Sequence, residues 1–155
     1  MRSRLMRRAI TLSGEHMRAG RGGPFGAIVV RNHEIVAEGT NRVTSTNDPT
    51  AHAEVVAIRE ACQHLGTHNL AGCDLYTSCE PCPMCLGAIY WARLDRVFYA
   101  NTREDAAAIG FDDDLIYREF AKPILDRTLS FIRLSLPEGR GIFQEWADKP
   151  DKIPY

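Results

Sequence analysis

Apolar side chains recur at helical spacing near the start of the chain and then gather into short runs. Between residues 5 and 17 an apolar side chain returns roughly every third or fourth position, which predicts a first helix. Residues 26–30 and 35–39 are short apolar runs of the kind that form strands. The pair Asn32-His33 between them is typical of a tight turn, so we expect a hairpin.

The rest of the chain alternates between the two patterns. We expect helices at about 49–65, 83–91, 103–109 and 115–120, and strands at 73–77, 97–100 and 130–134. Prolines interrupt the C-terminal part, where the pattern is weak. Strands that alternate with helices after a hairpin predict an α/β fold, with helices on both faces of a mixed sheet.

Composition narrows the class of protein. The chain has 155 residues, of which 45% are hydrophobic and 25% charged, as in an ordinary single globular domain. No stretch approaches the ~20 apolar residues of a membrane span, and no apolar run follows the N-terminal arginines. Four of the five cysteines lie between residues 73 and 85, which favours a metal or redox site over a disulfide framework. We therefore expect a protein of the reducing cytoplasm, with no membrane partner.

Charge is unevenly distributed along the chain. The net charge is −1, but residues 1–31 hold seven arginines and one glutamate, whereas the remainder holds 12 basic and 19 acidic residues. The arginines fit a solvated amphipathic helix, and the alternative is an RNA-binding arm. The first interpretation is favoured, because the molecule as a whole has no electrostatic preference for nucleic acid.

Two clusters carry the residue types of a metal centre, namely His52-Ala53-Glu54 and Pro81-Cys82-Pro83-Met84-Cys85. One imidazole and two thiolates are good zinc ligands, and three protein ligands leave a fourth position open, as in catalytic zinc sites. Both cysteines lie at the start of an expected helix, whose partial positive charge favours thiolates. Glu54 is two residues from His52 and points differently, so it is placed to handle protons.

Each cluster has a second interpretation when taken alone. The Cys-x-x-Cys pair could be redox-active or half of a structural zinc site, and Cys79 is suitably spaced to be a fourth ligand that closes the site. A closed site would leave Glu54 without a role. Taken together, His-x-Glu followed by Pro-Cys-x-x-Cys matches the signature of the zinc nucleobase deaminases. We therefore expect one catalytic Zn²⁺ per chain, held by His52, Cys82 and Cys85.

These motifs and several other segments resemble the cytidine deaminase superfamily, on the branch that contains guanine deaminases and tRNA adenosine deaminases. The matching segments are Gly-Gly-Pro-Phe-Gly-Ala at 22–27, Asn41, residues 47–54, residues 77–92 and Gly-Phe-Asp-Asp at 110–113. The last of these and the terminal Tyr155 are similar to bacterial guanine deaminases in particular. The resemblance covers essentially the whole chain, although it does not account for the arginine-rich start.

The resemblance implies a three-layer α/β/α fold with a five-stranded mixed sheet and a single deaminase domain over 1–155. It implies zinc on His52, Cys82 and Cys85, with Glu54 as the proton shuttle. Substrate-binding positions carried over by the motifs are Phe25, Asn41, Ala53 and Tyr155. Asp113 would assist proton transfer, and the other interpretation of 112–114 is a cap for the following helix.

The resemblance also implies a reaction and an assembly. The reaction is hydrolytic deamination of guanine to xanthine, with a small purine as the partner molecule. The assembly is a homodimer in which the segment from about 112 to 155 is exchanged between subunits, so that Tyr155 closes an active site. The alternatives are a tRNA adenosine deaminase, which the basic start would suit, and a non-catalytic interaction module stabilised by zinc.

Overall fold

The computed structural model describes all residues, Met1–Tyr155, and divides them into two compact units, 1–114 and 115–155. The first unit contains the sheet and the helices that pack on it. Its elements are α1 (Arg2–Arg18), β1 (Gly26–Arg31), β2 (Glu34–Thr40), α2 (Val43–Thr46), α3 (Ala53–Leu65), β3 (Cys73–Cys79), α4 (Pro83–Trp91), β4 (Arg96–Asn101) and α5 (Arg103–Ala108).

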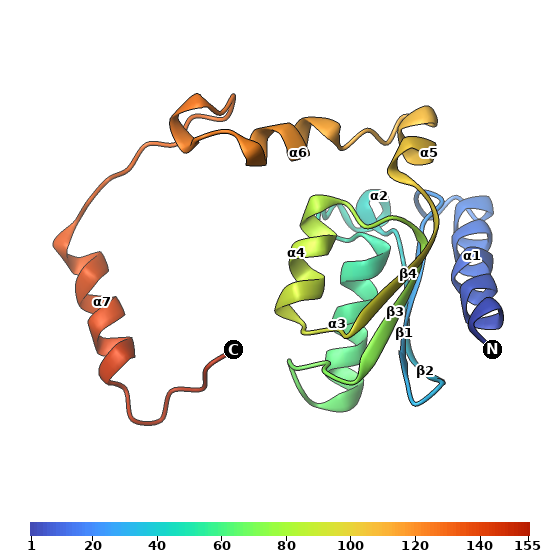
Figure 1. Cartoon of the computed structure of the whole chain (residues 1–155), viewed down its shortest axis with the longest axis horizontal. Coiled ribbons are helices and arrows are strands. Elements are labelled where there is room, and N and C mark those ends of the chain that lie inside the picture. Colours follow the sequence, from blue (N-terminus) through green and yellow to red (C-terminus); the bar gives the residue numbers. More distant parts are fainter. The chain divides into compact units, whose positions relative to one another are not determined.

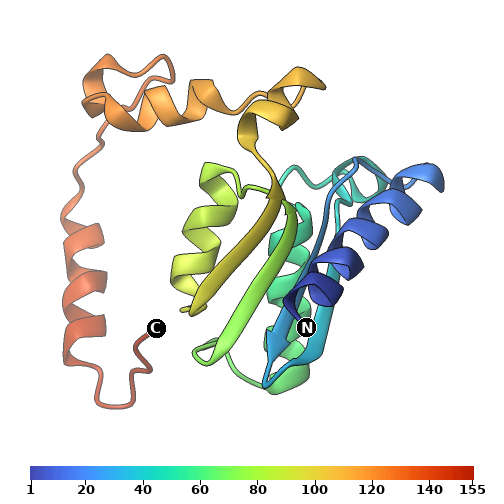
Figure 2. The ribbon, with the colours of Figure 1, turned by 45° about the vertical axis from the view of Figure 1, so that its right-hand side comes forward.

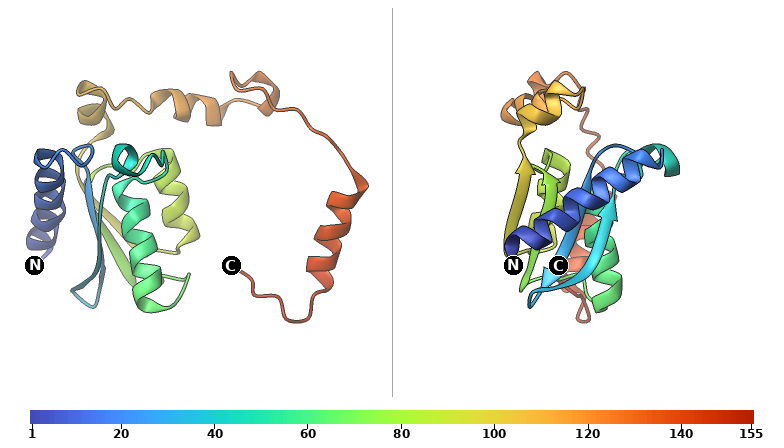
Figure 3. Two further views of the ribbon diagram at one scale, coloured as in Figure 1. Left: turned by 180° about the vertical axis from the view of Figure 1, so that it is seen from behind. Right: turned by 90° about the vertical axis from the view of Figure 1, so that its right-hand side faces the viewer.

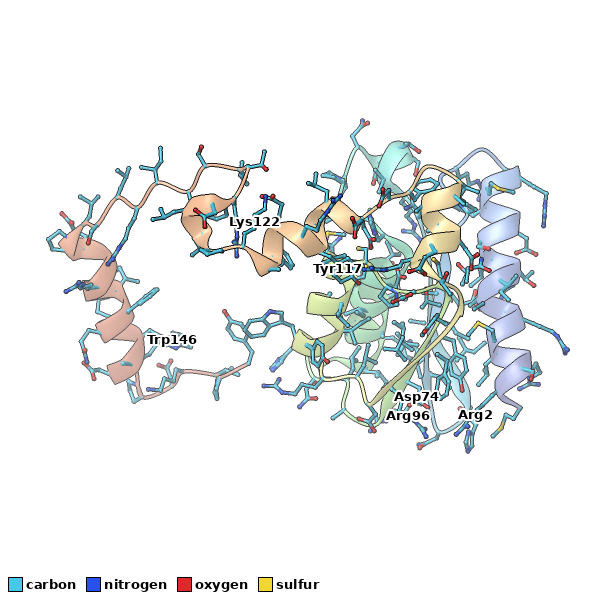
Figure 4. All side chains as sticks on the ribbon, turned by 45° about the horizontal axis from the view of Figure 1, so that its top comes forward. Arg2, Asp74, Arg96, Tyr117, Lys122 and Trp146 are labelled. Carbon is cyan, nitrogen blue, oxygen red and sulfur yellow. The ribbon has the colours of Figure 1, made fainter.

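The sheet is mixed, as expected, and has the strand order β2-β1-β3-β4 (Figure 1). β1 pairs antiparallel with both β2 and β3, whereas β3 and β4 are parallel. Asn32 and His33 both have positive φ, at 51° and 70°, which is the type I′ geometry of a two-residue hairpin turn. Across β3 and β4, Asp74 accepts two hydrogen bonds from Arg96, at 2.8 and 2.7 Å (Figure 4).

Helices cover both faces of the sheet, which confirms the three-layer α/β/α prediction. α1 lies on one face, and α3 and α4 lie together on the other (Figures 2 and 3). The α1 face buries Leu5, Ala9, Leu12, Ile28, Val30 and Tyr76. The α3 face buries a larger cluster that includes Val29, Ala57, Ile58, Leu70 and Leu75.

Glycine lets α3 lie close to the sheet at the point where the helix begins. A Cβ on Gly39 of β2 would lie 2.2 Å from the backbone oxygen of Ala53 and 2.5 Å from the nitrogen of Ala57. No side chain fits at those distances. The close approach holds the first turn of α3, and with it His52 and Glu54, against the sheet.

The structure differs from the predicted pattern at several elements. Helix α3 begins at Ala53 rather than at 49 or 50, because Asp48 accepts hydrogen bonds from the Thr50 backbone N–H and hydroxyl and so makes a turn. The short helix α2 was not expected. The sheet has four strands rather than five, because residues 130–134 pair with no strand.

The second unit consists of short helices joined by extended segments. It contains most of α6 (Asp114–Ala121), then η1 (Ile124–Asp126) and α7 (Pro137–Asp148). No residue from 115 to 155 is buried, and Trp146 of α7, labelled in Figure 4, is 47% exposed. The unit therefore has no hydrophobic core of its own. In neither unit is any helix both long and apolar enough to cross a membrane.

Candidate active site

Two helix N-termini hold the predicted metal ligands. His52 is the N-cap residue of α3, and Cys82 is the N-cap residue of α4, with Pro83 in the first turn and Cys85 two residues further on. α3 and α4 pack against each other on the same face of the sheet (Figure 1). The N-terminal partial positive charge of α4 favours a thiolate at Cys82, its N-cap residue.

The three ligand atoms have the spacing of a zinc site. His52 Nδ1 lies 3.5 Å from Cys82 Sγ and 3.5 Å from Cys85 Sγ, and all three atoms lie within 4.8 Å of one another. Zinc–nitrogen and zinc–sulfur bonds of about 2.0–2.1 and 2.3 Å, set at a tetrahedral angle, would place nitrogen and sulfur about 3.6 Å apart. The residues present therefore fit a zinc ion without rearrangement.

The ligands already differ in protonation before any metal binds. Contact with the Cys85 thiol and with His52 lowers the pKa of Cys82 to about 4, so Cys82 is a thiolate. The hydrogen bond to Cys82 and burial raise the pKa of Cys85, and contact with Cys82 raises the pKa of His52. A metal ion that takes both sulfurs must therefore displace the Cys85 proton.

Cys79 is not part of this group. Its thiol donates a hydrogen bond to the backbone oxygen of Thr102 at 3.5 Å, and burial raises the pKa of Cys79 to about 11. The three-residue cluster that could hold a metal does not include it. The geometry therefore supports an open site with three protein ligands rather than a closed structural site.

Glu54 lies in the first turn of α3, directly beside the ligand group. It is 6% exposed, and burial raises the pKa of its carboxyl group. Its Oε1 accepts a hydrogen bond from the Thr77 hydroxyl at 2.8 Å, and its Oε2 lies 3.5 Å from Cys85 Sγ. A buried carboxyl group with a raised pKa, held next to a metal site, is suited to accept and release protons.

The loop that carries Asn41 is tied to the segment before His52. The Arg42 backbone N–H donates to the Ala51 oxygen at 2.9 Å, and the Asn41 N–H donates to the Phe25 oxygen at 3.2 Å. Asn41 is buried, and its Oδ1 accepts a hydrogen bond from the Val43 N–H at 3.3 Å. The amide Nδ2 is therefore the end of Asn41 that remains as a donor.

Two aromatic residues meet near this loop. The rings of Phe25 and Phe111 pack edge to face, with centroids 4.9 Å apart. Edge-to-face contact of this kind fixes the orientation of both rings. Phe111 was not singled out from the sequence, although it lies in the Gly-Phe-Asp-Asp segment.

The three consecutive aspartates separate into different environments. Asp112 Oδ1 accepts a hydrogen bond from the Asp114 N–H at 2.9 Å, so Asp112 stabilises the start of α6. Asp113 is partly buried, and burial together with the negative charge of Cys82 raises the pKa of Asp113. The charge of Cys82, a predicted metal ligand, therefore acts on the Asp113 carboxyl group. Tyr155 belongs to the other unit and is 71% exposed.

Two contacts at the site were not expected from the sequence. One is the hydrogen bond from Thr77 to Glu54, and the other joins His16 Nε2 of α1 to the Asn41 backbone oxygen at 2.7 Å. Thr77 stands out only as a polar residue between Leu75 and Cys79 in the row of β3 that faces α3. His16 carries no signal in the sequence, because 25 residues separate it from its partner.

Comparison with known proteins identifies the family. Residues 1–101 match the cytidine and deoxycytidylate deaminase zinc-binding region. The chain belongs to this deaminase family. The matched residues include His52, Cys82 and Cys85, and the family's zinc-binding region agrees with the ligand geometry described above. We conclude that this member of the deaminase family binds one zinc ion per chain.

Relatives within the deaminase family differ in how much of the chain they match. The guanine deaminase of Bacillus subtilis is 56% identical over 150 residues, which are 97% of this chain and 96% of that protein. A crystal structure of guanine deaminase from the same organism superposes with a TM-score of 0.96 at 55% identity, covering 99% of this chain and 98% of the other. The tRNA-specific adenosine deaminase of Aquifex aeolicus is 47% identical over 77 residues, about half of each chain at 50% and 51%.

Proposed function

We propose that this chain is a zinc-dependent guanine deaminase, which converts guanine and water to xanthine and ammonia. The observation that best supports this proposal is the 56% identity to Bacillus subtilis guanine deaminase over 97% of the chain. A His-Cys-Cys group beside a buried glutamate supports the same chemistry. The sequence match to the tRNA-specific adenosine deaminase of Aquifex aeolicus covers only half of the chain, and a solved tRNA:A34 deaminase superposes with a TM-score of only 0.65 at 33% identity, so that alternative has less support.

The chain's own residues account for the proton transfers. A zinc ion held by His52, Cys82 and Cys85 would supply an activated water and a Lewis acid. Glu54 accepts a proton from the water and delivers it to the guanine ring nitrogen next to C2, which makes C2 more electrophilic. The water oxygen bonds to C2. Glu54 then accepts the remaining proton of this oxygen and, assisted by Asp113, passes it to the amino group, which leaves as ammonia when the C2–N bond breaks and the C2 carbonyl of xanthine forms.

We assign binding of the guanine base to three residues that lie close to His52 in the fold, namely Asn41, Phe25 and Ala53. Asn41 Nδ2 donates a hydrogen bond to an acceptor on guanine, and Phe25 lies against the ring. Ala53 begins α3, so its backbone N–H has no acceptor within the helix and is available to the base. Both bases present N7 as an acceptor, but at C6 guanine presents the O6 acceptor where adenine presents an amino donor, so a hydrogen-bond donor facing C6 favours guanine.

Asn41→Ala should lower kcat/KM for guanine by roughly 10- to 100-fold, because the side-chain hydrogen bond to the edge of the base is lost. The sharpest comparison is with 2-aminopurine, which keeps the reacting amino group but lacks the O6 oxygen. Wild type should prefer guanine over 2-aminopurine and over adenine, and Asn41→Ala should lose the preference over 2-aminopurine. Steady-state kinetics on the three bases measures this.

The control for Asn41 is a neighbouring side chain that leaves the backbone contacts of the loop intact. Ser45→Ala removes a hydroxyl bonded only to the Arg42 oxygen, and it should keep the wild-type preference. An equal loss on guanine and 2-aminopurine in Asn41→Ala would show that Asn41 does not bind O6. Comparable kcat/KM of wild type for guanine and adenine would also contradict the assignment.

Asp113→Ala should reduce guanine turnover more than Asp112→Ala or Asp114→Ala. The charge of Cys82 acts on the pKa of Asp113, whereas Asp112 holds the α6 backbone. We expect a fall in kcat toward the lower end of general acid–base effects, about 10²-fold, for Asp113→Ala. Asp112→Ala should instead act on thermal stability. The opposite ranking in kcat would move the role to a neighbour.

We propose further that the protein is a homodimer whose subunits exchange the segment from about 112 to 155. None of residues 115–155 is buried, and α6 and α7, at 8 and 12 residues, are too short to be stable alone in water. Exposed Ile142, Phe143 and Trp146 on α7 need a covering surface. Exchange between two copies supplies one and is a low-cost route to a symmetric dimer.

Deletion of residues 152–155 should leave a folded, zinc-loaded dimer with much weaker guanine turnover. The proposal assigns Tyr155 to closing the active site over the base, which excludes water and strengthens polar contacts there. Lys152→Ala with an intact Tyr155 is the matched control and should keep turnover. An unchanged kcat/KM in the truncated protein would show that the tail plays no part.

Mixed dimers decide which subunit's tail is used. The truncated chain keeps its own Glu54, and a full-length Glu54→Ala chain keeps its tail. Neither homodimer should turn over guanine well. If residues 152–155 close the active site of the partner subunit, heterodimers of the truncated chain and the Glu54→Ala chain recover activity. If these residues close the site of their own chain, the heterodimers stay inactive.

The function itself is tested by ammonia release from guanine, adenine, cytosine, cytidine and a tRNA anticodon stem-loop. Guanine alone should give a high rate, with xanthine as product. Preferred turnover of the stem-loop, with binding that weakens steeply as salt rises, would favour the tRNA enzyme. Absence of turnover on every substrate would favour the non-catalytic module. The five free cysteines fit the reducing cytoplasm as the place of action.

A further inference from the structure

Thr77 is a fully buried polar residue in the middle of the sheet. It lies on β3, paired with Ala27 of β1 and Tyr99 of β4, and its side chain faces α3. Its neighbours in the same row, Leu75 and Cys79, are apolar or weakly polar and are also buried. A buried hydroxyl without a partner costs free energy, so a valine would be the simpler residue here.

The partner of the Thr77 hydroxyl is Glu54 Oε1, at 2.8 Å. The other carboxyl oxygen, Oε2, is the one beside Cys85 Sγ. The two oxygens of Glu54 therefore have different surroundings, with Oε1 on the sheet side and Oε2 on the metal-ligand side. Once Cys85 is a metal-bound thiolate it has no proton to donate, and Thr77 remains as a hydroxyl donor to the carboxyl group.

We propose that Thr77 is a positioning residue for the reaction. Its hydroxyl anchors Oε1 and thereby reserves Oε2, the oxygen on the metal-ligand side, for proton transfer. The inference rests on the proposed function, because it takes Glu54 to be the proton shuttle. It adds a residue that does not touch the substrate but acts through Glu54.

The hydrogen bond suits both states of the shuttle. When Glu54 is ionised, Oε1 accepts from Thr77, and when Oε2 carries the proton, Oε1 is still a carbonyl oxygen that accepts from the same hydroxyl. The carboxyl group therefore need not rotate during the cycle. Preorganisation of this kind lowers the barrier because no reorientation is required at the moment of reaction.

The test compares Thr77→Val, which keeps the shape and removes the donor, with Thr77→Ser, which keeps the donor. A hydrogen bond to a charged group changes an equilibrium constant by about 10- to 100-fold, and we expect a change of the same size in the rate when this bond positions Glu54. Thr77→Val should lose about that factor in kcat for guanine, with KM little changed and one zinc per chain retained. Thr77→Ser should recover most of the loss. If Thr77→Val does not fold, Thr77→Cys, whose thiol is a weak donor, supplies the comparison.

A double variant separates positioning from simple loss of structure. In Glu54→Ala the shuttle is gone, so adding Thr77→Val should cause no further loss of the residual rate. Ser13→Ala, which removes another buried hydroxyl, bonded to the Ile10 oxygen on α1, should keep the wild-type kcat. Wild-type kcat in Thr77→Val, loss of zinc from it, a further loss in the double variant, or no recovery in Thr77→Ser would each overturn the inference. A wild-type protein inactive on guanine would instead refute the proposed function.

Discussion

Glu54→Ala should retain its zinc and lose about 10²–10⁴-fold in kcat for guanine, the range of a general acid–base group. We expect the upper part of this range, because Glu54 serves more than one proton transfer. Its carboxyl group is buried beside the ligand group but is not a member of it. Zinc content by elemental analysis and turnover by ammonia release give the two readouts.

The matched control is Glu60→Gln on the exposed side of the same helix, which should leave kcat and zinc content unchanged. Glu54→Gln should behave like Glu54→Ala. The amide keeps the shape of the side chain, but it cannot accept and release a proton as a carboxyl group does. Rates like the wild type in a zinc-loaded Glu54→Ala protein would remove Glu54 from the mechanism.

Cys85→Ser should lose zinc and with it all measurable deamination. Cys85 is fully buried, and its sulfur lies 3.5 Å from His52 Nδ1 within the ligand group. A serine hydroxyl at this position is a poor zinc ligand compared with a thiolate, and only two ligands would remain. Zinc per chain, Tm and kcat should all fall together, because metal binding contributes to folding.

Cys79→Ser is the matched control for Cys85→Ser. It also replaces a buried cysteine, but the Cys79 thiol is bonded to the Thr102 oxygen and a serine hydroxyl can make the same contact. Zinc content and most activity should therefore be retained. Loss of the metal from Cys79→Ser would mean that Cys79 closes the site as a fourth ligand and that the open-site mechanism is wrong.

The metal ligands could be predicted from the sequence because their positions depend on local structure. His52 and Cys82 are N-cap residues, and Cys85 is in the first turn after Cys82, so the spacing within each motif sets the geometry. The hairpin at Asn32-His33 is local in the same sense, because its two positive φ values close the turn. Short-range patterns of this kind need no knowledge of tertiary contacts.

The C-terminal part was the least predictable. Residues 130–134 have strand-forming side chains, but a strand also needs a neighbour, and the sequence does not say whether one is present. Helix α7 was missed because Gly139 and Gly141 lower its helix propensity. The start of α3 was predicted too early, because the Asp48 side chain accepts a hydrogen bond from the Thr50 backbone and forms a turn before the helix.

The substrate side of the site depended on family resemblance and on tertiary contacts. Asn41 and Asp113 carry no motif by themselves, and their assignment came from the segments around them. Thr77 and His16 reach Glu54 and Asn41 across 23 and 25 residues of sequence. Contacts between residues so far apart follow from how α1, α3 and the sheet pack, which a one-dimensional pattern does not encode.

The most direct test of the account is a zinc titration of metal-free protein in the presence of guanine, with xanthine and ammonia both quantified. We predict that turnover rises linearly and reaches its maximum at one zinc per chain, with xanthine and ammonia formed in equal amounts. Guanine left unchanged by protein that holds one zinc per chain would contradict the central claim.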